Sequence, residues 1–203
     1  CAHLVFVFVS YATAFSWFPR SHDQFERVEF MRIIVNAISA NTGGIVTYTS
    51  NLIEYVSSSD IETTVYVPEC FDRSQFGDLD VEVISVKTKF FGPIHRFLWE
   101  QFVWRRIIKN SGADVVFSSA NYGVLFPHVP QVLLVQGEIY LNPVYRERVL
   151  PNLSWRERVS AFLRRNLMLV SARHSRAVIF PSQVALDSAL DYDSRLAENA
   201  SVN

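Results

Sequence analysis

The residues best suited to binding a phosphate are two adjacent glycines, Gly43 and Gly44. They follow a short apolar run at 33–35 and precede an amphipathic stretch, so they stand where a strand is expected to pass into a helix. Glycines let the backbone approach a phosphate closely, and a helix N-terminus adds N–H donors and a positive dipole end. The segment is neither G-x-G-x-x-G nor a P-loop. A phosphate site and a plain tight turn are both consistent with it.

Polar side chains also follow two later apolar runs, which end at Phe117 and Val135. Their hydroxyl and amide groups can bind a ligand or make ordinary turn hydrogen bonds. The glutamate after the second run can bind a sugar hydroxyl, act as a base, or simply be solvated. The candidates are Ser118, Ser119, Asn121 and Tyr122 after the first run, and Gln136 and Glu138 after the second.

Histidine and cysteine spacing argues against metal and nucleophilic chemistry. The five histidines are scattered, with no H-x-x-x-H pair and no spacing that suggests a Ser-His-Asp arrangement. The two cysteines, Cys1 and Cys70, make no metal-spaced pair and no disulfide framework. We therefore expect no metal and no cofactor. Only His128, between two prolines, is expected near a site.

The composition describes a globular chain. Of its 203 residues, 49% are hydrophobic and 19% are charged, which excludes a disordered chain. A net charge of −1 gives no reason to expect a nucleic acid partner. We expect a cytoplasmic location, and a single domain over residues 31–203, because no repeat or linker interrupts them.

Arginines are concentrated between residues 146 and 176, where there are eight of them and two glutamates. Apolar periodicity predicts a helix from Trp155 to Val170, with Ser154 and Glu157 forming a capping box. Such a helix can lie on an anionic membrane surface or face an anionic acceptor such as a lipid phosphate. It can also pack an apolar stripe into the core behind a solvated basic face. The membrane interpretation uses residues 154–176 at the cytoplasmic face.

Apolar strands alternate with amphipathic helices along the rest of the chain, which predicts a doubly wound, Rossmann-like parallel α/β sheet. Ligands bind such sheets at the carboxyl ends of the strands, where the glycine pair and the polar loops fall. We expect strands at 33–35, 63–67, 81–86 (near an edge), 115–117, 132–135 and 177–180, and helices at 45–57, 94–109, 155–170 and from Ser182 onward.

Residues 1–30 do not match this pattern. The apolar run at 4–18 is too short, and too often interrupted by polar residues, for a membrane span. A signal peptide would begin with basic residues, and none precedes this run. Three interpretations stay open: an N-terminal extension that is not native or is disordered, a membrane-associating segment, and an extra strand. Met31 opens the first clear strand pattern.

Four segments resemble, in order, the N-terminal half of the family 4 glycosyltransferases: MRIIVNAISANTGGIVTYTSNLIEYV, GADVVFSSANYG, VPQVLLVQGE and SARHSRAVIFPSQVALDSAL. These are retaining enzymes of the GT-B fold, with two doubly wound domains. The resemblance covers residues 31–203 and implies the acceptor-side domain, without the C-terminal donor domain. It implies a nucleotide-sugar donor, a glycan or lipid-linked acceptor, hexosyl transfer without a metal, and a role in cell-envelope polysaccharide synthesis.

By this resemblance Gly43 and Gly44 contact the donor diphosphate, while Tyr48, Asn121, Gln136 and Glu138 line the acceptor side of the cleft. Many members carry a histidine where Gln136 stands, and an amide cannot shuttle a proton, so no catalytic residue is assigned. The family's paired glutamates belong to the donor domain, so we expect the chain alone to be inactive. The alternative is a stand-alone Rossmann-like binding or interaction domain, which the fold alone does not distinguish.

Overall fold

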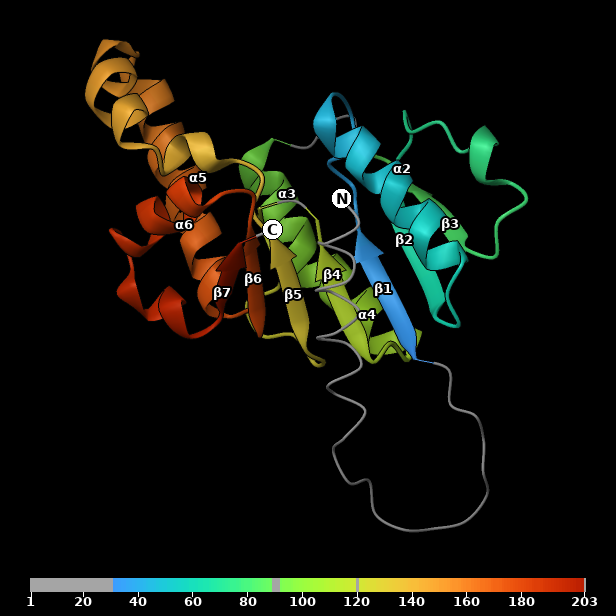
Figure 1. Cartoon of the computed structure of the whole chain (residues 1–203). Coiled ribbons are helices and arrows are strands. Elements are labelled where there is room, and N and C mark those ends of the chain that lie inside the picture. Colours follow the sequence, from blue (N-terminus) through green and yellow to red (C-terminus); the bar gives the residue numbers. More distant parts are fainter. Residues whose placement is uncertain (1–30, 89–91, 120, 203) are drawn as a thin grey trace.

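The computed structural model describes residues 31–88, 92–119 and 121–202, so the interpretations of residues 1–30 lie outside the described part of the chain. Within that part, seven parallel strands form one sheet in the order β3-β2-β1-β4-β5-β6-β7 (Figure 1). The strands are β1 (Arg32–Asn36), β2 (Glu62–Pro68), β3 (Glu82–Val86), β4 (Val115–Ser118), β5 (Gln131–Leu134), β6 (Ala177–Phe180) and β7 (Ala200–Val202).

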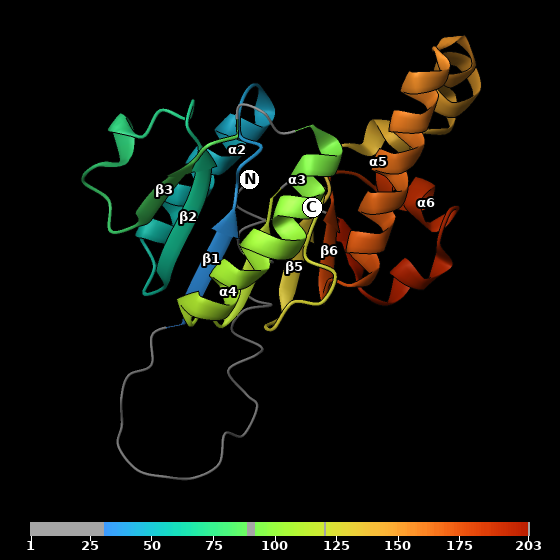
Figure 2. The same cartoon turned by 180° about the vertical axis from the view of Figure 1, so that it is seen from behind.

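Helices connect these strands and cover both faces of the sheet (Figures 1 and 2). The α-helices are α2 (Gly44–Ser57), α3 (Pro93–Trp99), α4 (Arg105–Ser111), α5 (Trp155–Arg173) and α6 (Gln183–Leu190). Shorter 3-10 or π segments are η2 (Ser74–Phe76), η3 (Glu100–Trp104), η4 (Glu138–Tyr140), η5 (Tyr145–Val149), η6 (Leu150–Asn152) and η7 (Ser194–Glu198).

The central strand shows why its residues are uniformly apolar. Ile33 and Val35 point to one face and pack with Leu52 of α2. Ile34 points to the other face and packs with Ile108 of α4. Successive side chains of a strand alternate between faces, so a strand covered by helices on both sides must be apolar throughout. The predicted doubly wound parallel α/β fold is confirmed.

Most predicted elements form where they were expected. The strand predicted at 81–86 becomes β3 at one edge of the sheet. Ser154 and Glu157 form the predicted capping box at the start of α5. The helix predicted at 94–109 is divided into α3 and α4 by the π segment η3. Such π segments often occur at functional positions in helices.

The core-packing interpretation is wrong for the first half of α5. Trp155, Val159 and Phe162 are 69%, 48% and 56% exposed, whereas Met168 and Leu169 are buried in the core. A helix of 19 residues is about 28 Å long, while a four-residue strand such as β6 spans about 13 Å. The first turns of α5 therefore extend past the sheet, as Figures 1 and 2 show. None of the described helices is long and apolar enough to cross a membrane.

Candidate functional site

The direction of strand order reverses at β1, because β2 pairs with one side of it and β4 with the other. In open parallel sheets the loops on either side of such a switch point separate and leave a crevice at the carboxyl edge, where ligands bind. Here the loops after β1 and β4 flank that position, and α2 begins there (Figure 1, upper edge of the sheet). The candidate site is built from these two loops and the elements that hold them.

The N-terminus of α2 is open to an anion. Gly43 adopts a φ of 68°, a left-handed conformation that favours glycine, and leads directly into the helix. Within the described part of the chain no side chain caps the helix, and its first turn holds no acidic residue. Gly43 and Gly44 are exposed, and a Cβ added at either would meet no heavy atom of residues 31–88, 92–119 or 121–202 within 4 Å. Together the uncapped amides, the dipole and the open space form the geometry that phosphate binding needs.

The loop after β1 is anchored across the switch point by Asn36, which is buried. The Asn36 carbonyl accepts hydrogen bonds from the backbone N–H of Ser119 at 3.0 Å and from its hydroxyl at 2.9 Å. The Asn36 side chain accepts from Ile38 N–H at 3.4 Å. Ser118 is also fully buried and donates to Gln131 at 3.5 Å. The two serines therefore use their hydroxyls inside the protein.

Asn121 joins the loop after β4 to the loop after β5. Its Oδ1 accepts hydrogen bonds from the backbone N–H groups of Gln136 and Gly137, each at 2.6 Å. Its φ of 66° lies in the left-handed region, which asparagine tolerates better than most residues. Asn121 is thus a positioning residue that holds two loops of the carboxyl edge in register.

We expect Asn121→Ala to lower the free energy of unfolding by about 2 kcal/mol, because two backbone donors lose their acceptor. Asn121→Asp keeps the acceptor oxygen and tolerates the same backbone conformation, so it should stay close to wild type. Urea unfolding of the three proteins measures this. Equal losses for both variants would contradict the assigned role of the Oδ1 atom.

A buried ion pair lies next to Asn36. Glu100 in η3 is fully buried, and its Oε1 accepts from Arg96 Nε at 3.2 Å and from Asn36 Nδ2 at 3.3 Å. No residue of the described part bonds its Oε2. Burial raises the pKa of Glu100 to about 7, although Arg96 and Asn36 pull it down. The Arg96 guanidinium also lies 5.3 Å from the ring centroid of Tyr122, after β4.

Sequence reasoning missed Glu100 because a glutamate inside a predicted helix normally lies on the solvated face. The π segment turns it inward, and a local widening of the helix leaves no clear pattern in the sequence. The one available signal was the spacing of Arg96 and Glu100 at i and i+4, which also occurs on ordinary helix surfaces.

The other residues predicted to line the acceptor side are Tyr48, Gln136 and Glu138, and the structure places them differently from one another. Tyr48 packs against Phe117 with ring centroids 6.4 Å apart, and burial raises the pKa of its hydroxyl. Gln136 is half-buried beside Asn121 at the carboxyl edge. Glu138 begins η4, and its side chain lies outside the described atoms. Their contacts with an acceptor stay a prediction.

His128 lies away from this edge. It stands two residues before Pro130, whose carbonyl accepts from the N–H of Val116 near the start of β4. Neighbouring Phe126 packs against His174 at the C-terminal end of α5, with ring centroids 4.9 Å apart. Both contacts are at the amino-terminal edge of the sheet, so the expectation that His128 lies near the site is wrong.

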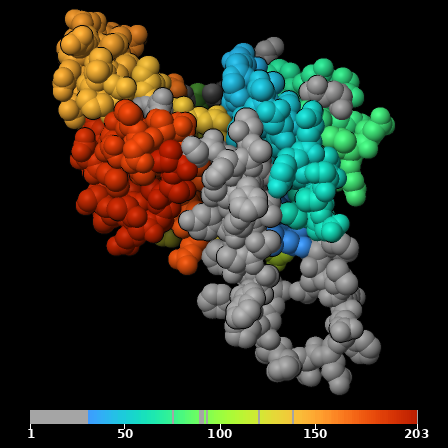
Figure 3. All heavy atoms as spheres, viewed as in Figure 1, coloured from blue at the N-terminus to red at the C-terminus, as the bar shows by residue number. Residues whose placement is uncertain are grey.

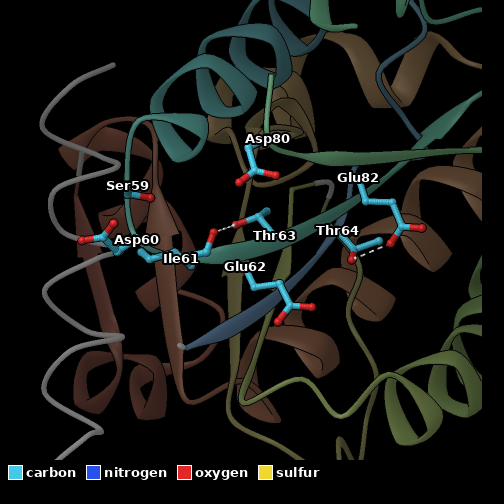
Figure 4. Close-up of a pocket in the computed structure, with 8 residues that line it drawn as sticks. All are labelled: Ser59, Asp60, Ile61, Glu62, Thr63, Thr64, Asp80 and Glu82. Carbon is cyan, nitrogen blue, oxygen red and sulfur yellow. Dashed lines mark hydrogen bonds between the residues drawn. The ribbon is translucent and has the colours of Figure 1, made fainter. Parts of the chain in front are cut away.

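A hollow of about 340 Å³ lies at that amino-terminal edge, beside the starts of β2 and β3 (Figure 4). Thr64 donates to Glu82 at 3.1 Å, and Glu62 pairs with Arg32 at 2.7 Å. Its acidic lining would repel an anionic ligand. No group of three or more His, Cys, Asp or Glu side chains among the described residues is placed to hold a metal ion. The residues around the hollow are Ser59, Asp60, Ile61, Glu62, Thr63, Thr64, Asp80 and Glu82.

The fold and site define a doubly wound α/β domain with an uncapped, glycine-led helix N-terminus beside its switch point. A sequence profile of Glycosyltransferase Family 4 matches residues 42–197, well over half of the chain. The chain therefore belongs to glycosyltransferase family 4. The matched region includes both glycines of the site.

Among solved structures, the UDP-GlcNAc 2-epimerase from Methanocaldococcus jannaschii is similar at 12% sequence identity and a TM-score of 0.49. The match covers 85% of this chain and 44% of that enzyme, so this chain spans less than half of the enzyme's length. A search of curated proteins found no match.

Proposed function

We propose that this domain is the acceptor-side half of a retaining glycosyltransferase that moves a hexosyl group from a nucleotide sugar to a glycan or a lipid-linked acceptor. The observation that carries the proposal is the open N-terminus of α2 at Gly43 and Gly44, placed at the switch point of a family 4 domain. Family membership does not favour the alternative of a stand-alone binding domain.

Sugar transfer breaks the bond between the sugar and the donor diphosphate, so negative charge grows on the leaving phosphate. Backbone N–H groups and a helix dipole aimed at that phosphate stabilise the charge as it develops. The acceptor would then occupy the part of the edge near Asn121, Gln136 and Glu138. A neutral amide at Gln136 can orient a hydroxyl but cannot take its proton. The departing phosphate is the group left to accept it, as in the family's retaining mechanism.

Family 4 enzymes hold the nucleotide sugar mainly through a second domain, so we expect the chain by itself to be inactive. A cytoplasmic location, a role in cell-envelope polysaccharide synthesis and the absence of a metal requirement belong to the same proposal. So does contact with an anionic membrane through residues 154–176, which the exposed apolar side chains in the first half of α5 support.

The test is Gly44→Val in the chain joined to a family 4 donor domain. The valine side chain would fill the space proposed for the phosphate, while its Cβ would meet no heavy atom of the described residues within 4 Å. We expect kcat/KM for the nucleotide sugar to fall by about tenfold or more, because an amide contact to a developing anion is lost.

The matched control is Gly77→Val, at an exposed glycine with an ordinary φ of −62° and no place in the site. Its turnover should equal that of the unchanged enzyme. Unchanged turnover in Gly44→Val, with the control also active, would contradict the diphosphate assignment.

A further inference from the structure

We propose that the tip, defined as residues 142–163, docks on an anionic lipid bilayer and brings the site to a membrane surface. The proposal deepens the membrane contact of the proposed function, and it specifies which surface makes that contact. Because binding to lipid is measured without sugar transfer, its failure is distinguishable from failure of the transferase assignment.

The tip is a projection beyond the sheet. It consists of η5, η6 and the first turns of α5, and it rises past the carboxyl edge (Figures 1 and 2). Figure 3 shows it as a lobe above the rest of that half of the molecule. Arg146 contacts the body of the domain through the Tyr192 hydroxyl at 3.5 Å, whereas the outward side chains of the projection stay exposed, so a broad flat surface can reach them.

Five large apolar side chains of the tip are more than 40% exposed. Isolated exposed apolar residues are common, but a group of them on one projection indicates a contact surface. Trp155 is the most exposed of the five at 69%, and tryptophan favours the interface between lipid headgroups and acyl chains. The five are Val144, Val149, Trp155, Val159 and Phe162.

The charge of the tip selects its partner. It carries four arginines and two glutamates, all exposed. The carboxylate of Glu157 is engaged by the Ser154 hydroxyl at 2.7 Å and backbone N–H at 2.9 Å. The guanidinium of Arg156 lies 5.6 Å from the ring of Trp155, so a cation flanks the most exposed aromatic side chain. Apolar side chains flanked by arginines match a surface of lipid tails below phosphate headgroups.

A second copy of the chain fits this surface less well, because two tips of the same positive charge would repel each other. An acidic protein would satisfy the arginines and leave unexplained why the exposed apolar residues gather on a projection. A bilayer accounts for the charge, the apolar side chains and the projecting shape together.

The experiment measures co-sedimentation of the full chain with vesicles of phosphatidylcholine alone and of phosphatidylcholine mixed with phosphatidylglycerol. We expect binding mainly to the anionic vesicles. Reversing Arg148 or Arg156 to glutamate should weaken that binding by about fivefold or more for each change. Trp155→Ala should weaken the binding to anionic vesicles by about tenfold, because the apolar contact between the indole ring and the bilayer is lost. Trp155→Phe should keep most of the binding but lose the blue shift of tryptophan emission.

Two controls match these variants. Phe102→Ala removes a 73% exposed aromatic side chain from η3, and Arg106→Glu reverses an exposed arginine of α4. Both should bind as the unchanged chain does. The proposal is overturned by equal binding to both kinds of vesicle, by equal losses in the controls, or by binding that survives every change in the tip. Capture on immobilised polyglutamate without vesicle binding would instead indicate an acidic protein partner and would also overturn it.

Discussion

Gly123→Ala is expected to lower the free energy of unfolding by about 3 kcal/mol, the cost of forcing a side chain into a filled interior. A Cβ at this position would lie 2.4 Å from Nε2 and 2.7 Å from Cδ of Gln131. The Gln131 amide is fully buried and cannot move without losing its partners. It accepts from Val124 N–H at 2.8 Å and donates to Ser175 Oγ at 2.9 Å.

Urea unfolding measures this loss against Gly77→Ala, whose Cβ would lie 3.8 Å from the Ser74 carbonyl oxygen, an ordinary van der Waals contact. That control should change stability by less than about 0.5 kcal/mol. The double variant Gly123→Ala/Gln131→Ala has a shorter side chain at position 131, which makes room for the new Cβ. Its loss of unfolding free energy should therefore be smaller than the sum of the losses in the two single variants. Fully additive losses would mean that the Gly123 and Gln131 sites do not meet.

The effect reaches the candidate site because Gly123 belongs to the loop that follows β4. Its carbonyl accepts from Gln101 Nε2 at 3.0 Å and from Ser171 Oγ at 3.4 Å. The start of this loop, at Asn121, holds the loop after β5. Displacing Gly123 should therefore disturb the polar edge of the crevice as well as the core.

The fold could be predicted from the sequence because its determinants are local. A strand covered on both faces has a short, uniformly apolar sequence bounded by turn residues. The runs at 33–35 and 177–180 show this pattern. The caps at Ser154 and Ser182 depend on residues only three positions away. The direction of chain crossover then follows from a handedness that nearly all parallel sheets share.

The polar loops could be placed but their hydrogen bonds could not. The sequence puts Asn121 and Gln136 at the same edge of the sheet. That the Asn121 side chain is used by the backbone of residues 136 and 137 depends on how β4 and β5 are registered. The predicted strand at 132–135 begins one residue after Gln131, and the sequence gives no sign that Gln131 is a buried support packed against Gly123. The extent of the tip likewise depends on the length of α5 relative to the sheet.

Glu100 should make the protein less stable as pH rises from 5 to 8. Burial raises the native pKa from 4.5 to about 7, so in this range the native state holds a proton that the unfolded state releases. Stability falls with pH wherever the native state binds more protons than the unfolded state. Integrating between these two pKa values gives a loss of about 2 to 3 kcal/mol between pH 5 and pH 8.

Glu100→Gln removes the titration and keeps an oxygen that can accept from Arg96 and Asn36. The free energy of unfolding of this variant, followed by urea titration at each pH, should therefore lack the decline attributed to Glu100. Glu54→Gln, at an exposed glutamate of α2, is the matched control and should keep the decline. Asp193 affects the stability of the protein at lower pH than Glu100 does. Burial raises the pKa of Asp193, but Arg173 and Arg195 outweigh it and hold the pKa below the usual value.

Comparing the pH dependence of the unfolding free energy in the wild type and in Glu100→Gln also tests whether the crevice at the switch point responds to pH. Asn36 bonds Glu100 through its side chain and Ser119 through its carbonyl, so the carboxyl group is linked to both loops of the crevice. Deprotonation leaves a charged carboxylate that only Arg96 and Asn36 offset within the described part of the chain. If the wild-type and Glu100→Gln curves run parallel, Glu100 is ionised on both sides of neutral pH and the link is absent. If the wild type instead loses stability relative to Glu100→Gln from about pH 5 upward, protonation of one buried carboxyl stabilises the anchor of the loop that leads to Gly43 and Gly44.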